Sequence, residues 1–270
     1  MKFVAKQTMP KVAGSPARQN EDVFRPSHSK RDISRFVLCD GATTSFAGHV
    51  WAEALAEAMV TGRMPQLDSY PLLVGDVGYL SSLRDVFFKD VITAAKHKYE
   101  NVYDISKLSF FKQEAFKRGS ASTFLMLEQD PTDANSIAVT SVGDTCVFVA
   151  TEEGRIAQSF PLTRVEEFST SAYLVESRDD AIARLFDSQT RDLYWRRTML
   201  DLNGYGEAKL VCATDAVSQW IVANKDNLDA LRGLFEATAK SKKAFSRFIR
   251  DLRLEGAMGI DDSTVVILEK

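Results

Sequence analysis

SASTFLMLEQDPTDANSIAVTSVGDTCVFVA, residues 120–150, contains three short apolar runs separated by turn-forming residues. The runs are residues 120–127, 136–142 and 145–150, and the clusters between them are rich in Asp, Asn, Pro and Gly. Short apolar runs bounded by such residues are typical of strands joined by turns. We therefore predict three consecutive antiparallel strands, with a fourth strand near 155–160 completing a meander.

The rest of the chain adds strands near both ends and helices between them. Apolar residues recur at spacings of three and four in the predicted helices, whereas the predicted strands are short and apolar. Strands are predicted at 2–8, 35–39, 193–200, 208–213 and 263–269, and helices at 46–61, across 79–117 as one helix or two, and at 216–224, 227–236 and 242–254. Because strands and helices are segregated rather than alternating, the pattern favours an α+β fold over a doubly wound parallel sheet.

Residues 161–190 differ from their surroundings. They are more polar and less periodic, and only the stretch SRDDAIARLFDS (177–188) is a candidate for a short helix. We interpret this segment as an insertion or flap. No other composition shift divides the chain, so we predict a single domain over residues 1–270 with residues 161–190 as its flap.

The composition is that of an ordinary globular protein. The 270 residues include 34 Lys and Arg against 37 Asp and Glu, a formal net charge of −3, and 45% of the residues are hydrophobic. These values exclude a disordered chain, and the nearly balanced charge argues against a nucleic-acid-binding surface. No segment has the roughly 18 consecutive apolar residues of a spanning helix, and the N-terminus lacks a secretory signal. We expect a cytoplasmic monomer with no nucleic-acid or membrane partner.

The three cysteines, Cys39, Cys146 and Cys212, each lie within a short apolar run. Their number does not suit a disulfide framework, and a catalytic cysteine would need a histidine base, of which the chain has only three candidates. The sequence therefore predicts buried free thiols, which suit a reducing compartment.

Acidic residues stand where predicted strands begin or end. Asp22, Asp40, Asp215 and Asp261 each adjoin an apolar strand, and Asp144 lies in the turn between two strands. Each aspartate alone is a common turn residue. Five of them at strand ends favour a site where carboxylates converge around a cation, because like charges repel unless a cation neutralises them. An all-oxygen donor set without a His/Cys cluster favours Mg²⁺ or Mn²⁺ over zinc.

At these positions the sequence resembles the metal-dependent protein phosphatases, the PPM or type 2C Ser/Thr phosphatases. Arg18 is followed by six blocks in the order of that family: NEDVF (20–24), LCDGA (38–42), GSAST (119–123), SVGDT (141–145), CATDA (212–216) and DDSTVVIL (261–268). Each block is weak alone, but together they span residues 12–268. The resemblance implies a four-layer α-β-β-α sandwich, in which two antiparallel sheets are flanked by helices.

The resemblance also implies a role for each matched residue. Asp22 and Asp40 match acids that hold two metal ions, with Asp40 bridging them and Gly41 offering its backbone carbonyl. Asp215 and Asp261 match the remaining metal-binding carboxylates. The other matches are Glu21, an acid that contacts metal-bound water, and Arg18, the arginine that holds the substrate phosphate. Asp262 stands where the family usually has Asn, and we expect it to support the metal-binding residues without binding metal itself.

The chain departs from the family pattern at two places. Where the family has Asp-Gly followed by another acid four residues after the aspartate, this chain has Ala216 and Gln219. That acid contributes to a third metal site, so Asp144 is either a third-metal ligand or a plain turn residue. After Gly41 the chain lacks the histidine that protonates the leaving group in some members, and His49 lies further on in a predicted helix.

The leading hypothesis from the resemblance is a phosphatase of phosphoserine and phosphothreonine proteins. It would use two Mn²⁺ or Mg²⁺ ions, with a third site left open, on substrates supplied by a cognate Ser/Thr kinase, and its lean domain resembles bacterial members. The alternatives are a catalytically silent phosphoprotein-binding module on the same fold and a hydrolase of small phosphate esters. Arg196-Arg197 is a small basic cluster that is either a solvated surface or a docking site for a phosphopeptide or partner.

Overall fold

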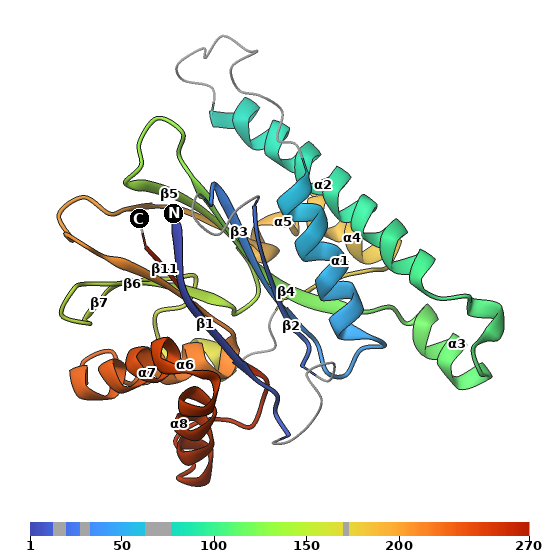
Figure 1. The fold of residues 1–270 in the computed structure, drawn as a ribbon. Coiled ribbons are helices and arrows are strands. Elements are labelled where there is room, and N and C mark those ends of the chain that lie inside the picture. Colours follow the sequence, from blue (N-terminus) through green and yellow to red (C-terminus); the bar gives the residue numbers. More distant parts are fainter. Residues whose placement is uncertain (13–19, 28–32, 63–76, 170–172, 270) are drawn as a thin grey trace.

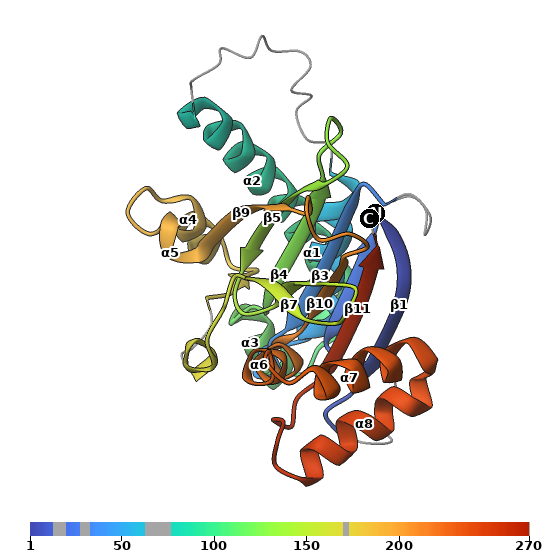
Figure 2. The same ribbon diagram turned by 90° about the vertical axis from the view of Figure 1, so that its left-hand side faces the viewer.

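The computed structural model describes residues 1–12, 20–27, 33–62, 77–169 and 173–269, with side chains of the second long helix described from residue 84. Two antiparallel β-sheets pack face to face, and helices cover both outer surfaces (Figures 1 and 2). This arrangement confirms the predicted α+β sandwich of four layers. The two termini lie side by side, because Lys2 pairs with Glu269 in neighbouring strands.

The first sheet has the strand order β1-β11-β10-β6-β7. Its strands are β1 (Lys2–Met9), β6 (Cys146–Ala150), β7 (Ile156–Phe160), β10 (Lys209–Ala213) and β11 (Ser263–Glu269). The second sheet has the order β2-β3-β4-β5-β9, and a short strand β8 also pairs with β4. Its strands are β2 (Asp22–Pro26), β3 (Arg35–Gly41), β4 (Ala121–Gln129), β5 (Ser136–Val142), β8 (Val175–Glu176) and β9 (Trp195–Asp201).

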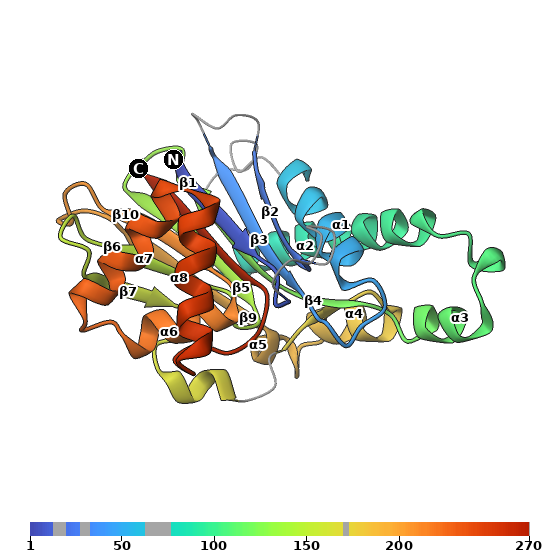
Figure 3. The ribbon, with the colours of Figure 1, turned by 60° about the horizontal axis from the view of Figure 1, so that its bottom comes forward.

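Different helices cover each sheet. α1 (Gly48–Thr61) and α2 (Val77–Val102) lie on the second sheet, and α6 (Asp215–Ala223), α7 (Leu228–Lys240) and α8 (Lys242–Leu254) lie on the first, on the opposite side of the molecule (Figure 3). Short helices η3 (Ile105–Lys107), α3 (Phe110–Lys117), η4 (Val165–Ser169), α4 (Asp179–Phe186) and α5 (Arg191–Tyr194) occupy the connections. None of the helices in the described part of the chain is long and apolar enough to cross a membrane.

The core consists of three layers because side chains alternate along each central strand. In β3, Phe36 and Leu38 face the other sheet, whereas Val37 and Cys39 face the helices. In β11, Val266 and Leu268 face inward and Val265 and Ile267 face the covering helices. Every second residue of β3 faces the other sheet. Asp40 follows Phe36 and Leu38 in this series, so its side chain points into the space between the sheets.

The predicted meander is wrong at one point. Strands β4 and β5 pair as predicted, but β6 does not pair with β5 and lies instead in the first sheet, between β10 and β7. The turn at Gly143-Asp144 carries the chain from one sheet to the other. Gly143 has φ +97°, and a Cβ there would lie 2.5 Å from Cγ2 of Thr123, so this turn requires glycine.

The predicted flap, residues 161–190, contains η4, β8 and α4, and residues 170–172 within it lie outside the described part. β8 pairs with β4, and the apolar side of α4 buries Ala181, Ile182 and Leu185. At the other end of the segment, Leu162, Val165 and Phe168 pack against the core under the first sheet, so both ends rest on the sandwich. The predicted burial of the three cysteines is confirmed, and burial raises the pKa of Cys146 to about 12.

Candidate metal centre

Asp22 and Asp40 lie directly opposite each other on the neighbouring strands β2 and β3. Residues opposite each other on antiparallel strands project from the same face of a sheet, with Cβ atoms about 5 Å apart. Asp40 has the inward parity of Phe36 and Leu38, so both carboxylates point into the space between the two sheets. The register of β2 with β3 thus brings together two acids that are 18 positions apart in the sequence.

A hydrogen bond links Asp22 to the other sheet. Thr214 follows β10, and its hydroxyl Oγ1 donates to Oδ2 of Asp22 over 3.1 Å. Asp215, the next residue, begins α6, so its carboxylate lies in the first turn of a helix that starts at this end of the first sheet. The ends of β2 and β10, from different sheets, therefore meet where these acids lie.

Asp261 and Asp262 immediately precede β11, the neighbour of β10. The carboxylate of Asp262 accepts hydrogen bonds from the backbone N–H groups of Lys11 (2.7 Å) and Glu21 (2.6 Å). Asp262 therefore holds the backbone at Lys11 and at Glu21, the residue before Asp22.

Gly41 packs against the start of α1. A Cβ at this position would lie 2.7 Å from the backbone carbon of Gly48 and 3.0 Å from the carbonyl oxygen of Glu21, so only glycine allows this approach. The carboxylate of Glu21 accepts a hydrogen bond from Nζ of Lys11 over 3.4 Å. Glu21 and Gly41 thus adjoin the Asp22–Asp40 pair.

Asp144 lies on the turn between β5 and β6, the connection that joins the two sheets. Burial raises its pKa, and the charge of Asp261 raises it further. Gln219 lies one turn after Asp215 on α6. Asp144 therefore lies within electrostatic reach of Asp261.

Several solved structures that this chain resembles in fold are phosphatases. A bacterial serine phosphatase matches with a TM-score of 0.56 and 14% identity over 98% of this chain and 96% of that chain. The serine/threonine phosphatase Stp1 from Staphylococcus aureus matches with a TM-score of 0.52 and 14% identity over 100% and 97% of the two chains. The chain has the fold of these phosphatases.

The photosystem II phosphatase PBCP matches with a TM-score of 0.51 and 14% identity over 98% of this chain and 97% of that chain. No family model matches the sequence, and neither does any curated protein sequence. The fold that the resemblance implies is thus confirmed. At 14% identity, the likeness to these structures shows the fold alone.

The phosphatase fold concentrates negative charge at one place. Burial raises the pKa of Asp40 well above its ordinary value, and neighbouring charges add to the increase. These charges belong to Asp22, Asp215, Asp144 and Asp261. Burial likewise raises the pKa of Asp215 to about 7, with further contributions from Asp144 and Asp261. These carboxylates thus form one electrostatic cluster, and protonation or a cation is needed to neutralise it.

The donor set of this cluster fits a hard divalent cation. All its donors are oxygens, and Oδ1 of Asp22 is buried without a hydrogen-bond partner among the described residues. However, no three acidic, histidine or cysteine side chains in the described ranges are grouped closely enough to hold one ion. The carboxylates therefore interact electrostatically, but they are not arranged around a single point. Arg18 lies outside the described residues.

The structure also shows supporting residues that the sequence pattern did not single out. Arg253 on α8 donates to the backbone oxygens of Pro10 (3.2 Å), Lys11 (3.3 Å) and Asp261, and to Oγ of Ser263 (2.9 Å). It joins the end of β1 to the start of β11. The Thr214 hydroxyl was a local signal, because it immediately precedes Asp215, whereas Arg253 depends on how α8 docks.

We expect the stability of the metal-free protein to reflect the raised pKa of Asp215. The folded protein holds this proton up to about pH 7, whereas an unfolded chain releases it near pH 4, so stability falls as pH rises between these values. Asp215→Asn removes the effect. Relative to the wild type, the variant should gain up to about 4 kcal/mol between pH 4.5 and 8.

Urea unfolding in the presence of a chelator at pH 4.5, 6 and 8 measures this difference. Taking the difference between variant and wild type cancels the titration of groups that do not interact with Asp215. A stability difference that stays constant across these pH values would contradict the raised pKa.

Proposed function

We propose that the chain is a metal-dependent phosphatase of phosphoserine and phosphothreonine proteins, a single PPM-type domain over residues 1–270. The observation that carries the proposal is the carboxylate cluster itself. Acids from both sheets meet at one end of a phosphatase fold, where Thr214 of one sheet donates to Asp22 of the other. The six sequence blocks that resemble the PPM family contain these acids.

The residues that would hold two Mn²⁺ or Mg²⁺ ions are four carboxylates of the cluster. They are Asp22, Asp40, Asp215 and Asp261, together with the backbone carbonyl of Gly41. When bound, such a pair of ions supplies a hydroxide nucleophile near neutral pH and offsets the charge of the phosphoryl oxygens. A protein nucleophile is then unnecessary, which agrees with three cysteines that are all buried.

The supporting residues have separate roles in this proposal. Asp262 holds the backbone before Asp22 through the N–H groups of Lys11 and Glu21, and Thr214 orients the Asp22 carboxylate. Arg18 would bind the substrate phosphate, for which a guanidinium is suited because it donates two parallel hydrogen bonds. Asp144 would serve a third metal ion, but Gln219 replaces the carboxylate that shares this site in the family, so we propose two ions per chain.

The test is hydrolysis of a phosphothreonine peptide with and without Mn²⁺. We expect phosphate release that depends on the metal and is abolished by a chelator. A panel containing p-nitrophenyl phosphate and sugar phosphates separates a protein phosphatase from a hydrolase of small esters, which would prefer the latter. Absence of metal-dependent release from every substrate would contradict the proposal.

A silent phosphoprotein-binding module is the second candidate. It is favoured by the finding that no three possible ligands are grouped around one point in the described ranges, and by Gln219. Calorimetry with Mn²⁺ separates the two candidates, because an active enzyme should bind about two ions with clear heat, whereas a silent module should bind none.

A further inference from the structure

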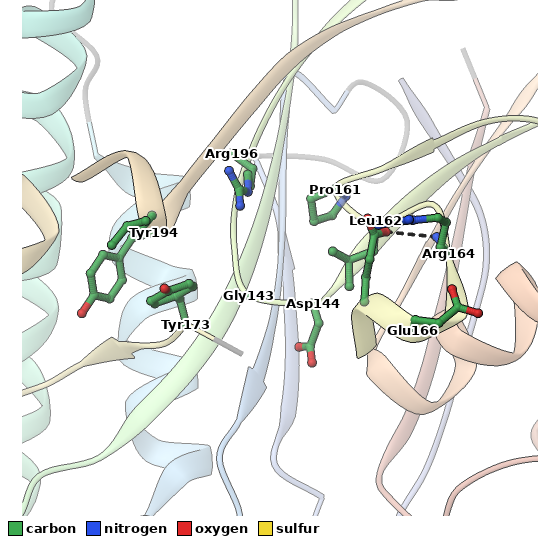
Figure 4. Close-up of a pocket in the computed structure, with 11 residues that line it drawn as sticks. Gly143, Asp144, Pro161, Leu162, Arg164, Glu166, Tyr173, Tyr194 and Arg196 are labelled. Carbon is green, nitrogen blue, oxygen red and sulfur yellow. Dashed lines mark hydrogen bonds and ion pairs between the residues drawn. The ribbon is translucent and has the colours of Figure 1, made fainter. Parts of the chain in front are cut away.

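A cavity of about 480 Å³ opens beside the carboxylate cluster (Figure 4). Its wall consists of the Gly143–Asp144 turn, a segment that includes Pro161 and Leu162, and the α5–β9 region with Tyr173. The second part also carries Arg164, Glu166 and Glu167, of which Arg164 and Glu167 form an ion pair, so the positive charge offered to a ligand is that of Arg196 in the third part. The volume of the cavity lies within the usual range for ligand sites, about 300–1,000 Å³. Asp144, one of the clustered carboxylates, lies in the wall, so the cavity reaches the cluster at this residue.

Strand alternation explains why Arg196 faces this cavity. Trp195 and Arg197 project from the outer face of the second sheet, where Trp195 packs against Phe88 and Arg197 donates to Asp85 of α2 over 3.0 Å. Arg196, between them, projects from the opposite face. β9 is an edge strand, so Arg196 there lines the cavity together with the Gly143–Asp144 turn (Figure 4).

Two arginines line the cavity, and they differ in whether they form an ion pair. Arg164 forms an ion pair with Glu167 at 3.2 Å. Arg196 is exposed and makes no ion pair with any residue in the described ranges. The Arg196-Arg197 cluster of the sequence is therefore divided, because Arg197 is held by α2 and Arg196 faces a cavity.

The remaining wall suits a peptide. Tyr173 and Tyr194 lie with their ring centroids 4.9 Å apart, and Leu162 and Leu193 add apolar surface. Tyrosine pairs provide apolar area with polar edges, which binds peptide backbone and aliphatic stems at low entropic cost. A carboxylate on such a stem would place its charge at Arg196.

We propose that this cavity binds an acidic side chain, aspartate or glutamate, that lies close in sequence to the phosphorylated residue of the substrate, with Arg196 as its cationic partner. The inference rests on the proposed phosphatase function, because it places the phosphorylated residue at the carboxylate cluster. The cavity thereby makes the enzyme selective for phosphopeptides with acidic neighbours.

The experiment compares matched phosphothreonine peptides that carry Glu or Gln at each position flanking the phosphorylated residue. For the wild type we expect kcat/KM to favour Glu at one or more positions by about 5-fold, the upper end of what an exposed ion pair contributes. Arg196→Gln should abolish this preference, and Arg196→Glu should reverse it towards Lys-containing peptides. Turnover of p-nitrophenyl phosphate should stay unchanged in both variants.

Arg155→Gln is the matched control, since Arg155 is an exposed arginine in the β6–β7 connection and does not line the cavity. It should keep the preference for Glu. A wild type that does not distinguish Glu from Gln, or an Arg196→Gln variant that retains the preference, overturns the proposal. Peptide affinity is also measured by fluorescence anisotropy without turnover, so a chain that fails to hydrolyse any substrate contradicts the proposed function while the affinity ratio still decides the role of Arg196.

Discussion

Asp40→Asn is expected to lower Mn²⁺-dependent hydrolysis of a phosphothreonine peptide by at least about 100-fold, the upper end of the loss seen when even a supporting residue of a metal site is removed. Asp40 lies opposite Asp22 and interacts with more of the clustered charges than any other acid whose pKa is raised. An amide at this position keeps the size of the side chain and removes the charge that would hold the cations.

The same substitution should stabilise the metal-free protein. Burial and four neighbouring carboxylates raise the pKa of Asp40, so its ionised form is unfavourable in the fold at neutral pH. Removing the charge relieves this repulsion, and we expect a higher free energy of unfolding than that of the wild type in urea at pH 7.5 with a chelator. A loss of activity that merely reflected misfolding would come with lower stability, so the two opposite changes together identify a charge cluster built for cations.

The control for this experiment is Asp226→Asn. Asp226 is exposed in the connection between α6 and α7, and its substitution should change neither activity nor stability appreciably. An Asp40→Asn variant with unchanged Mn²⁺-dependent turnover would contradict the proposed metal centre.

Local sequence patterns were sufficient for most of the fold. The predicted helix at 242–254 matches α8 at both ends, because Ser241 accepts a hydrogen bond from the backbone N–H of Ala244 and Phe245 and Ile249 form a buried stripe. The prediction of strands at 136–142 and 145–150 was also correct. Their pairing was not, because a local pattern cannot show that Cys146 pairs with Ala213 rather than with β5.

For the candidate site too, some features could be predicted from local sequence and others could not. Acids at strand ends were visible locally, and strand order then determined that they meet. What the sequence could not show is the contacts between distant segments, such as Thr214 with Asp22 or Arg253 with Pro10. These contacts depend on the packing of one sheet on the other and on the position of α8, to which many residues contribute. The cavity at Arg196 is of the same kind, since it depends on β9 being an edge strand.

Arg253→Met is expected to weaken both the fold and Mn²⁺ binding. The guanidinium of Arg253 joins the backbone oxygens of Pro10, Lys11 and Asp261, and three of its hydrogen bonds are 2.9–3.3 Å long. Methionine keeps the aliphatic stem but removes the donor to the Pro10 and Lys11 oxygens, whereas the Asp261 oxygen still accepts from the hydroxyl of Ser263 over 3.2 Å. We expect a loss of about 2–4 kcal/mol in urea unfolding, since each unsatisfied buried group costs about 1–3 kcal/mol.

Metal binding should weaken for a separate reason. Arg253 anchors the chain at Asp261 and also at Lys11, whose N–H is bound by Asp262, so it sets where the two sides of the candidate site lie. Loss of a supporting residue typically costs about 10–100-fold in metal affinity, and calorimetry with Mn²⁺ should show a loss in this range. Arg253→Lys should be intermediate, because an ammonium group donates hydrogen bonds but lacks the planar fork that reaches both segments at once.

Arg250 on the same helix provides the matched control. It is exposed and pairs only with Asp251, at 3.1 Å, among the described residues, so Arg250→Met should change stability by less than about 0.5 kcal/mol and leave Mn²⁺ affinity unchanged. If Arg253→Met lost stability but bound Mn²⁺ like the wild type, Arg253 would be a structural residue alone. If instead Arg253→Met and Arg250→Met had the same stability and Mn²⁺ affinity, the hydrogen bonds from Arg253 to the two strands would contribute nothing to the free energy of unfolding. A combined loss in Arg253→Met only, partly restored by lysine, is the result expected of a residue that positions the metal site through the backbone of its ligands.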